Sequence, residues 1–384
     1  MTAFESIPLC VPEIRGNEWA FLKECLDTNF VSSVGPFVDR FEQMTAEYVG
    51  TRYAVATANG TAALHIALLV AGVKEDEEVL VSTLTFIAPV NAIRYVGAWP
   101  VFIDAEPDYW QMDSEKVRDF LENGCYWREG ALYNKRSRRR VTAIIPVHIL
   151  GHPVDLQPVL EMANTFGLKV IEDATEGLGA TYKGKNLGSL GDIGCFSFNG
   201  NKMITTGGGG MIVTNHEALA CKAKYLTTQA KDHPIEYIHG MVGYNYRLTN
   251  LQAAVGCAQM EQLAVYVETK RRIAARYGKA LQGIAGITPM KEAIWASSSF
   301  WLYTVLVDEK KFGLDARGLL NKLDIKKIQS RPLWQPIHQS PAHAESYVGQ
   351  LPIAEQLYHQ GLSLPCSVGL SECDLDRVIT VIKE

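Results

Sequence analysis

The stretch from Ile193 to Asn215, IGCFSFNGNKMITTGGGGMIVTN, combines residue types that could do chemistry. Apolar strands are expected over 193–198 and 211–213, with Lys202 and then four glycines between them. A lysine between two buried strands is costly to desolvate, so either its stem reaches water or its amine is used, for example in a Schiff base with a carbonyl group. Consecutive glycines allow a backbone to approach a ligand closely. A glycine hairpin with an exposed lysine explains this stretch equally well by itself.

A second group of candidate residues follows the apolar strand expected over 168–173. The segment VIEDATEGLGA places Glu172, Asp173 and Glu176 at the end of that strand. A buried carboxylate at Asp173 needs a cationic partner. A protonated pyridine nitrogen is such a partner, because the carboxylate keeps the ring positive and able to withdraw electrons. The alternative is an aspartate that only caps the next loop.

Two further segments indicate an anion site. Residues 59–62 begin a helix directly after the strand expected over 53–57, and the free N–H groups of a helix N-terminus suit a phosphate. An ordinary helix cap by Asn59 is the alternative. Ser197 and Asn199 stand two apart on a strand, so both side chains face one side and could bind the same phosphate.

Phe86, in STLTFIAPVNA, opens another helix after a strand. It could stack on a planar ring, or it could be a core residue, which is the more frequent position of phenylalanine. An anion site, a stacking ring, a carboxylate and an amine nucleophile are together the groups that would bind pyridoxal phosphate.

The elements that must position these residues alternate between strand and helix. Such alternation predicts parallel βα units with ligands beyond the carboxyl ends of the strands. The expected strands of this region are 53–57, 78–82, 99–104, 141–148 and 168–173, and the helices between them are 61–71, 87–95, 114–122 and 156–166.

A long helix is expected over 248–281, because Leu251, Ala254, Val255 and Ala258 recur at helical spacing. Beyond it the pattern changes to a strand over 301–308 and three shorter helices. The chain of 384 residues is long for one core, so two domains are expected. We place a large α/β domain at residues 1–260 and a smaller α+β domain at 261–384.

The composition excludes several classes of protein. The 47% hydrophobic and 21% charged residues are typical of a soluble globular protein, and the net charge of −5 argues against a nucleic-acid partner. No membrane span and no secretion signal are visible, so a cytoplasmic location without membrane contact is expected. Eight scattered cysteines without CxxC suit a reducing compartment and no metal site. The basic run 135–140 is interpreted as a solvated loop rather than a phosphate site.

Five segments in this order resemble the DegT/DnrJ/EryC1/StrS family of sugar aminotransferases: NGTAALHIAL, TLTFIAPVNAI, VIEDATEGLGA, FSFNGNKMITTGGGGMI and GYNYRLTNLQAA. The resemblance covers nearly the whole chain. It implies an α/β fold like that of aspartate aminotransferase (fold type I), with a mixed, mostly parallel sheet, pyridoxal phosphate as cofactor and a homodimer that shares its active sites.

The resemblance also implies roles for individual residues. Lys202 would be the Schiff-base lysine, Asp173 the partner of the pyridine nitrogen and Phe86 the stacking ring. Asn245 would reach the phosphate across the subunit interface. The remaining phosphate contacts would be the backbone of Gly60, Thr61 and Ala62 and the side chains of Ser197 and Asn199.

Two positions depart from the usual family pattern. Glu176 stands where the family usually has Gln or His near the cofactor's phenolic oxygen, and Gly208 replaces the acid of TGEGG. Both departures are similar to a subgroup that aminates C4 of UDP-linked 2-acetamido-2,6-dideoxy-hexos-4-uloses, on the bacillosamine and legionaminic acid routes. A carboxylate beside a phenolate is repelled unless a proton is shared, so we expect an unusual protonation state at Glu176.

The expected function is transamination from L-glutamate to a UDP-linked 4-keto sugar for surface glycan or nonulosonic acid synthesis. A dTDP-4-keto-6-deoxy sugar is the alternative substrate. Candidate contacts to the nucleotide sugar, each also interpretable as an ion pair or core residue, are Lys231, Arg247, Arg331, Trp334 and His338.

Three other functions are weighed against this one. A sugar dehydratase of the same fold would carry histidine in place of Lys202. A nicotinamide oxidoreductase would need GxGxxG between a strand and a helix, whereas these glycines lie between two strands. A binding protein that keeps the fold is disfavoured, although not excluded, by the intact Lys202 and Asp173.

Overall fold

A computed structural model describes residues 6–233, 235–346, 349 and 351–384. Its centre is a seven-stranded sheet in the spatial order β1-β11-β10-β7-β6-β2-β3. Strand β11 runs antiparallel to both of its neighbours, and all other neighbouring strands are parallel. The strands are β1 (Tyr53–Thr57), β2 (Glu78–Ser82), β3 (Trp99–Ile103), β6 (Val141–Ile145), β7 (Lys169–Asp173), β10 (Ile193–Ser197) and β11 (Gly210–Thr214). The prediction of a mixed, mostly parallel sheet is confirmed.

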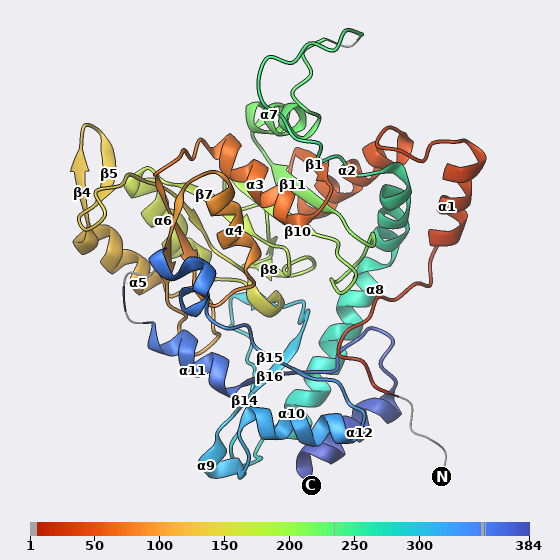
Figure 1. The fold of residues 1–384 in the computed structure, drawn as a ribbon. Coiled ribbons are helices and arrows are strands. Elements are labelled where there is room, and N and C mark those ends of the chain that lie inside the picture. The colour runs from red at the N-terminus through yellow and green to blue at the C-terminus, as the bar shows by residue number, and fades with distance from the viewer. Residues whose placement is uncertain (1–5, 234, 347–348, 350) are drawn as a thin grey trace.

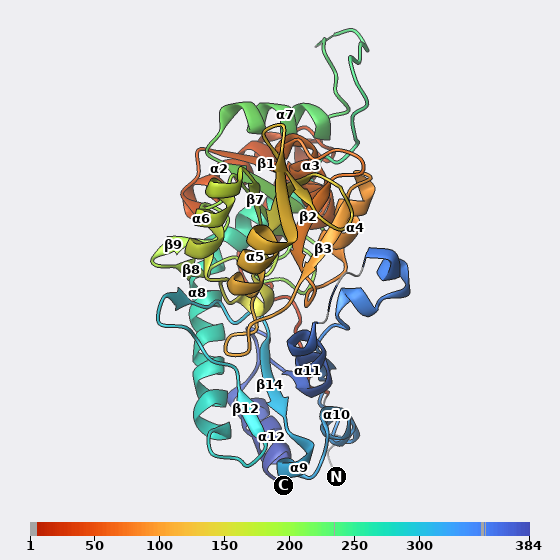
Figure 2. The same cartoon turned by 90° about the vertical axis from the view of Figure 1, so that its left-hand side faces the viewer.

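Helices cover both faces of this sheet (Figure 2). Successive strand residues alternate between two apolar clusters, so that Val79 and Val81 belong to one and Leu80 to the other. On the first face lie α3 (Gly60–Ala71), α4 (Ala88–Tyr95) and α7 (Glu217–Thr227). On the second face lie α2 (Pro36–Val49), α5 (Ser114–Asp119) and α6 (Leu156–Phe166), with α1 (Glu18–Asp27) outside α8.

Helix α8 (Asn250–Leu281) runs from the central sheet to the C-terminal part of the chain (Figure 1). It begins with a capping box, in which Thr249 and Gln252 satisfy each other's backbone N–H groups. The boundary placed at 260/261 falls inside α8, and this division into domains stays a prediction.

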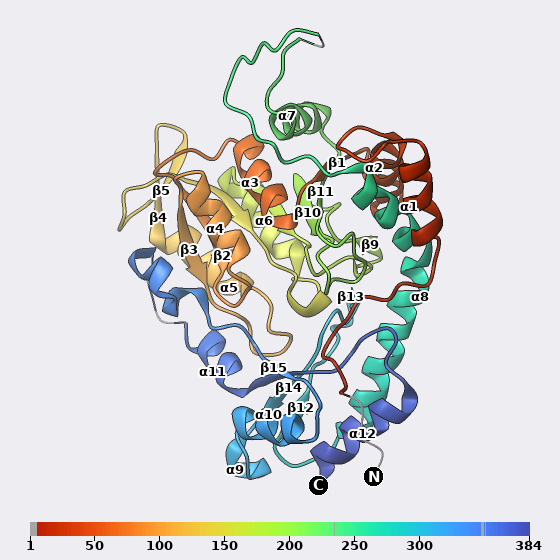
Figure 3. The ribbon, with the colours of Figure 1, turned by 45° about the vertical axis from the view of Figure 1, so that its right-hand side comes forward.

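The C-terminal part is built on a four-stranded antiparallel sheet in the order β12-β14-β16-β15. Helices α8, α10, α11 and α12 contact it or one another (Figure 3). The elements are β12 (Ile287–Pro289), β14 (Tyr303–Val307), α9 (Glu309–Phe312), α10 (Ala316–Ile325), β15 (Arg331–Pro332), η3 (Ile337–Gln339), η4 (Pro341–Ser346), α11 (Pro352–Gln360), β16 (Gly361–Leu364) and α12 (Glu372–Lys383).

Several short elements were not predicted. These are the hairpin β4 (Cys125–Arg128) and β5 (Ala131–Asn134), and the small sheet of β8 (Thr181–Tyr182), β9 (Lys185–Asn186) and β13 (Ala296–Ser297). Strands of two to four residues are too short to show a period. The basic run 135–140 does follow β5 as a turn, with the guanidinium of Arg139 4.4 Å from the centroid of Trp99.

Two predicted elements end three residues earlier than expected. Strand β6 stops at Ile145 instead of residue 148, because Pro146 has no N–H for the sheet. Helix α5 stops at Asp119 instead of residue 122 and continues as one π-helical turn, η1 (Phe120–Gly124). Among the described residues, none of the helices has the length and apolar character of a membrane span.

Candidate active site

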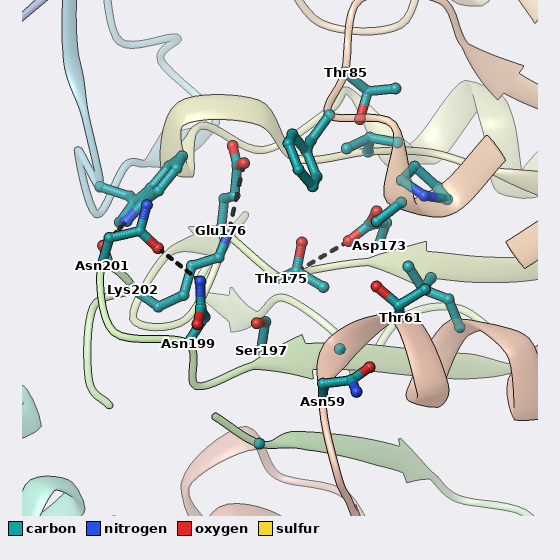
Figure 4. A pocket seen from close by; sticks show the side chains of 18 of the residues that line it. Asn59, Thr61, Thr85, Asp173, Thr175, Glu176, Ser197, Asn199, Asn201 and Lys202 are labelled. Carbon is teal, nitrogen blue, oxygen red and sulfur yellow. Dashed lines mark hydrogen bonds and ion pairs between the residues drawn. The ribbon is translucent and has the colours of Figure 1, made fainter. Parts of the chain in front are cut away.

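A cavity of about 240 Å³ opens beyond the carboxyl ends of β7 and β10, beside the N-terminus of α3 (Figure 4). Parallel strands bring their carboxyl ends to one edge of the sheet, and this is why residues far apart in sequence meet here. The predicted site residues that line the cavity are Gly60, Thr61, Phe86, Asp173, Glu176, Ser197, Asn199, Lys202 and Trp334.

Lys202 lies in the turn that follows β10, and its side chain points into the cavity (Figure 4). The side chain is only 14% exposed, and Nζ lies 3.5 Å from Oε1 of Glu176. Nζ also lies 4.2 Å from the ring centroid of Trp301, at cation–π distance. The alternative of a lysine exposed at the tip of a hairpin is therefore wrong.

Asp173 is the last residue of β7 and is buried. Its Oδ1 accepts a hydrogen bond from the backbone N–H of Thr175 at 3.1 Å. Burial raises the pKa of Asp173, while the hydrogen bonds from Thr175 and the charge of Lys202 oppose the rise. A buried carboxyl group that faces a cavity in this way is stabilised in its ionised form by a bound cation.

Glu176 is held by one backbone donor and one side chain. Leu150 N–H donates to Oε2 at 2.8 Å, which leaves Oε1 toward Lys202. Leu150 has φ of 60° in the short turn η2 (Ile149–Gly151), a strained backbone for leucine that points its N–H at the carboxylate. Burial raises the pKa of Glu176 to about 7, against the opposing effects of Lys202 and of the Leu150 hydrogen bond. Burial is thus the main cause of the raised pKa here, and the effect expected from a cofactor phenolate stays a prediction.

The N-terminus of α3 lies at the end of the cavity where the anion site is predicted. Within the described part of the chain, the backbone N–H groups of Gly60 and Thr61 have no hydrogen-bond acceptor. A Cβ at Gly60 would lie 2.8 Å from Cβ of Ser197, so only glycine lets the helix start lie against the end of β10. Ala62 differs from expectation, because its N–H donates to Oδ1 of Asn59 at 2.8 Å and it does not line the cavity.

The capping interpretation of Asn59 is therefore correct, and the cap is compatible with the predicted anion site, which stays a prediction. The cap fixes the third N–H of the helix and leaves the first two for a ligand.

His338, predicted as a substrate contact, is buried outside the cavity lining. Its Nδ1 lies 2.7 Å from Oγ1 of Thr83, and its Nε2 lies 3.0 Å from Oε1 of Glu355. The ring thus connects the loop after β2, which carries Phe86, to helix α11.

Lys231, Arg247, Arg331 and Asn245 also lie away from the cavity lining, so Trp334 is the one predicted substrate contact that lines it. Lys231 packs over the ring of Tyr237, and Arg331 donates to the carbonyl of Ser330. Asn245 is exposed, at a bridge to Thr228. The guanidinium of Arg247 donates to Oε1 of Gln229 at 3.4 Å.

Trp301 is a cavity residue that the sequence did not single out. Its ring stacks on Trp334 at an interplanar angle of 3°, and its Nε1–H donates to the carbonyl of Asn201 at 2.7 Å. It forms the wall over which the amine of Lys202 lies. No local signal could have found it, because Trp301 stands at the start of an apolar strand and its site contacts are all distant in sequence.

Pyridoxal phosphate fits the chemistry of these residues. An amine, a buried carboxyl, a half-exposed aromatic ring and a helix N-terminus match its aldehyde, ring nitrogen, flat ring and phosphate. The fold and this site define a pyridoxal-phosphate-dependent aminotransferase built like aspartate aminotransferase.

The chain belongs to the DegT/DnrJ/EryC1/StrS aminotransferase family, whose family model matches residues 12–383. It is similar to the GDP-perosamine synthase of Caulobacter vibrioides, with 40% identity over 100% of this chain and 99% of that protein. The putative pyridoxal phosphate-dependent aminotransferase EpsN of Bacillus subtilis is 38% identical over 98% of this chain and 95% of EpsN. The crystal structure of S. venezuelae DesV superposes with a TM-score of 0.88 at 29% identity, over 99% of this chain and 98% of DesV. The protein is thus a nucleotide-sugar aminotransferase.

Proposed function

We propose that the protein transfers the amino group of L-glutamate to C4 of a nucleotide-linked 4-keto-6-deoxyhexose. The observation that carries this proposal is the amine of Lys202 in one cavity with the buried carboxyl of Asp173 and the open N-terminus of α3. These groups lie far apart in sequence. Their meeting in one cavity favours an enzyme over a non-catalytic binding protein with the same fold.

Each residue has a separate task in this reaction. When bound, pyridoxal phosphate supplies an aldehyde and a ring that withdraws electrons. Lys202 would hold the aldehyde carbon, and its free amine would carry the proton that leaves Cα of the amino acid. Asp173 keeps the proton on the ring nitrogen, and Phe86 stacks on the ring.

The phosphate is bound at the other end of the cavity. The backbone N–H groups of Gly60 and Thr61 would donate to it together with the side chains of Ser197 and Asn199, and all four residues line the cavity. In a homodimer, Asn245 would approach this phosphate across the interface. Its exposed position outside its own chain's cavity supports that assignment.

For the sugar we propose a UDP-linked 2-acetamido-2,6-dideoxy-hexos-4-ulose. The support is the pair Glu176 and Gly208, both of which line the cavity, in the pattern of the subgroup that uses such substrates. A GDP-linked sugar is a second candidate, because two relatives of this protein are named GDP-perosamine synthases. They come from Caulobacter vibrioides and Escherichia coli O157:H7 and are 40% and 39% identical to this chain. A dTDP-linked sugar is the third.

One experiment separates these substrates. The purified protein with pyridoxal phosphate and L-glutamate is incubated separately with UDP-, GDP- and dTDP-linked 4-keto-6-deoxysugars. The products are identified by mass spectrometry. We expect conversion of the 4-keto group to an amine with the UDP-linked 2-acetamido sugar. Amination of only the GDP- or dTDP-linked sugars would replace the proposed substrate and leave the reaction standing.

Lys202→Ala tests the reaction itself. The variant should still bind pyridoxal phosphate at the helix N-terminus but lose turnover by at least about 10³-fold, because it lacks both the nucleophile and the proton carrier. Lys183→Ala, at an exposed position away from the cavity, is the matched control and should retain wild-type turnover. Near-normal transamination by Lys202→Ala would overturn the assignment.

A further inference from the structure

A cluster of two cysteines and a lysine lies behind the cavity wall, formed by segments from three parts of the chain. Cys10 comes from the N-terminal arm, Lys270 from α8 and Cys366 from the segment after β16. Nζ of Lys270 lies 3.5 Å from Sγ of Cys10 and 3.7 Å from Sγ of Cys366. None of these three residues lines the cavity or takes part in the proposed reaction.

The charge of Lys270 needs a counter-charge. The residue is 2% exposed, and its third hydrogen-bond partner is the carbonyl oxygen of Trp301 at 2.8 Å. Within the described part of the chain, no carboxylate lies in ion-pair range of this ammonium group. A buried ammonium without an anion is strongly disfavoured, so Lys270 keeps its charge only when one of the two sulfurs is a thiolate. Burial lowers the pKa of Lys270, but its interactions with Cys366 and Cys10 outweigh this and raise the pKa.

The two cysteines differ in a way that assigns the thiolate to Cys10. Cys10 is partly exposed, whereas Cys366 is buried. A hydrogen bond from Cys366 lowers the pKa of Cys10 to about 6, burial opposes this, and the charge of Lys270 adds to it. The pKa of Cys366 is raised by the same hydrogen bond and by burial. Cys10 is thus the accessible nucleophile and Cys366 the protonated thiol beside it.

The backbone already brings the two cysteines together. Cys366 N–H donates to the carbonyl of Leu9 at 2.8 Å, and Val11 N–H donates to Oγ of Ser367 at 3.0 Å. The Leu9 carbonyl belongs to the peptide bond that joins Leu9 to Cys10. Its hydrogen bond with Cys366 N–H therefore keeps the Cα atoms of Cys10 and Cys366 within roughly 7 Å of each other, which is the limit for a disulfide. Bridging therefore needs rotation of side chains and no refolding.

We propose that Cys10 and Cys366 form a reversible oxidation site, in which hydrogen peroxide converts the pair to a disulfide and Lys270 holds Cys10 as the reactive thiolate. The Cys10 thiolate takes one oxygen from peroxide, and with one proton this gives a sulfenic acid and water. The Cys366 thiol then displaces that oxygen as a second water, and the S–S bond forms. Peroxide is reduced to two waters, and two thiols are oxidised. A dithiol reverses the reaction.

The bridge would form next to the cavity. In its thiol form Cys10 donates to the carbonyl of Asn201 at 3.5 Å, and Asn201 precedes Lys202 and lines the cavity. The carbonyl oxygen of Trp301, whose ring lies beneath the Lys202 amine, accepts from Lys270 and lies 3.5 Å from Sγ of Cys366. The disulfide would tie the N-terminal arm to the C-terminal segment at this point.

The test is a peptide map that does not depend on transamination, so its failure is distinguishable from failure of the proposed function. The full-length protein is treated with limiting hydrogen peroxide, free thiols are alkylated, and the peptides are separated without reduction and identified by mass spectrometry. We expect the disulfide-linked Cys10–Cys366 peptide, lost on treatment with dithiothreitol, as the first oxidation product.

Variants assign the roles. Cys10→Ser should abolish the linked peptide, and Lys270→Gln should slow its formation by about tenfold or more, because the thiolate loses its cation. Cys221→Ser, at an exposed cysteine elsewhere, should leave the rate unchanged. If peroxide oxidises Cys221 and Cys373 while Cys10 and Cys366 stay unlinked in the wild type, the proposal is overturned. An undiminished rate in a folded Lys270→Gln variant would also overturn it.

Discussion

At the scale of single residues, Glu176 is a buried titratable group that faces the amine of Lys202. One oxygen is committed to the Leu150 N–H, and the other faces Lys202 at 3.5 Å. With burial raising its pKa to about 7, this carboxyl exchanges its proton near neutral pH. A glutamine in its place would keep the hydrogen bond from Leu150 and lose the titration.

We expect Glu176→Gln to change the pH dependence of stability in the cofactor-free protein. A carboxyl whose pKa rises on folding, here from 4.5 to about 7, contributes stability below its unfolded pKa. That contribution is lost as the pH rises through the folded pKa. The free energy of unfolding of the variant, relative to the wild type, should therefore increase from about pH 5 to about pH 8. Urea unfolding at the two pH values measures it.

Glu115→Gln, at a side chain that is 76% exposed, serves as the control and should show the pH dependence of the wild type. Identical pH dependence in Glu176→Gln and the wild type would contradict the raised pKa of Glu176.

At the scale of elements, helix α3 serves the core and the site at once. It is buried on nearly all sides, because it packs on the sheet and is covered by α4 and α7. A helix that is apolar all round has no polar face to orient it, so its position is fixed by packing and by the cap at Asn59. Its N-terminus therefore points at the carboxyl edge of the sheet, where a phosphate can use its N–H groups.

We expect Asn59→Ala to lower the free energy of unfolding by about 1 kcal/mol and also to weaken binding of pyridoxal phosphate. The second effect arises because the cap orients the first turn, which contributes Gly60 and Thr61 to the cavity. Denaturant unfolding and spectroscopic titration with the cofactor measure the two effects.

Ser371→Ala is the matched control, since Ser371 caps α12 far from the cavity by accepting from the N–H of Asp374. It should cost similar stability and leave cofactor affinity unchanged. Equal cofactor affinity in both variants would show that the α3 cap acts only on the fold.

At the scale of the whole molecule, several large apolar side chains of the single chain are exposed, and the predicted homodimer would cover such surfaces. The segment between α7 and α8 extends away from the rest of the chain in every view (Figure 1). In that segment Ile235, Tyr237 and Val242 are 81%, 87% and 81% exposed, and Trp19 of α1 is 82% exposed. Surfaces of this kind are usually covered by a partner. Asn245 lies at the base of the same segment.

We expect Lys202→Ala and Asn245→Asp subunits, each inactive by itself, to restore activity when they are mixed and reassociated. A hybrid dimer contains one subunit of each variant. If Asn245 acts across the interface, one active site of the hybrid is intact and the other carries both substitutions. Random reassociation should then recover about a quarter of wild-type activity, measured as amino-sugar formation. No recovery, with hybrid dimers verified by mass spectrometry, would place Asn245 in its own subunit's site or outside any site.

The site could be predicted where its residues follow a recognisable local pattern. Asp173 ends a strand, Asn59 caps a helix and Lys202 lies in the turn after a strand, and the structure brings them to one cavity. His338 and Arg331 carry suitable groups but no positional pattern, and they lie outside it. Strand β15, with two residues, is formed only by pairing with β16 and leaves no periodic signal.

The sequence by itself determined the order of strands and helices, the caps, and which residue types stand at the carboxyl ends of the strands, because these depend on neighbours within a few positions. Only the tertiary structure decided that Trp301 lies beneath the Lys202 amine, that Leu150 donates to Glu176, and that Lys270 lies between two cysteines. These contacts join segments separated by long stretches of chain. Their distances and the burial that shifts the pKa values result from packing, which no local pattern encodes.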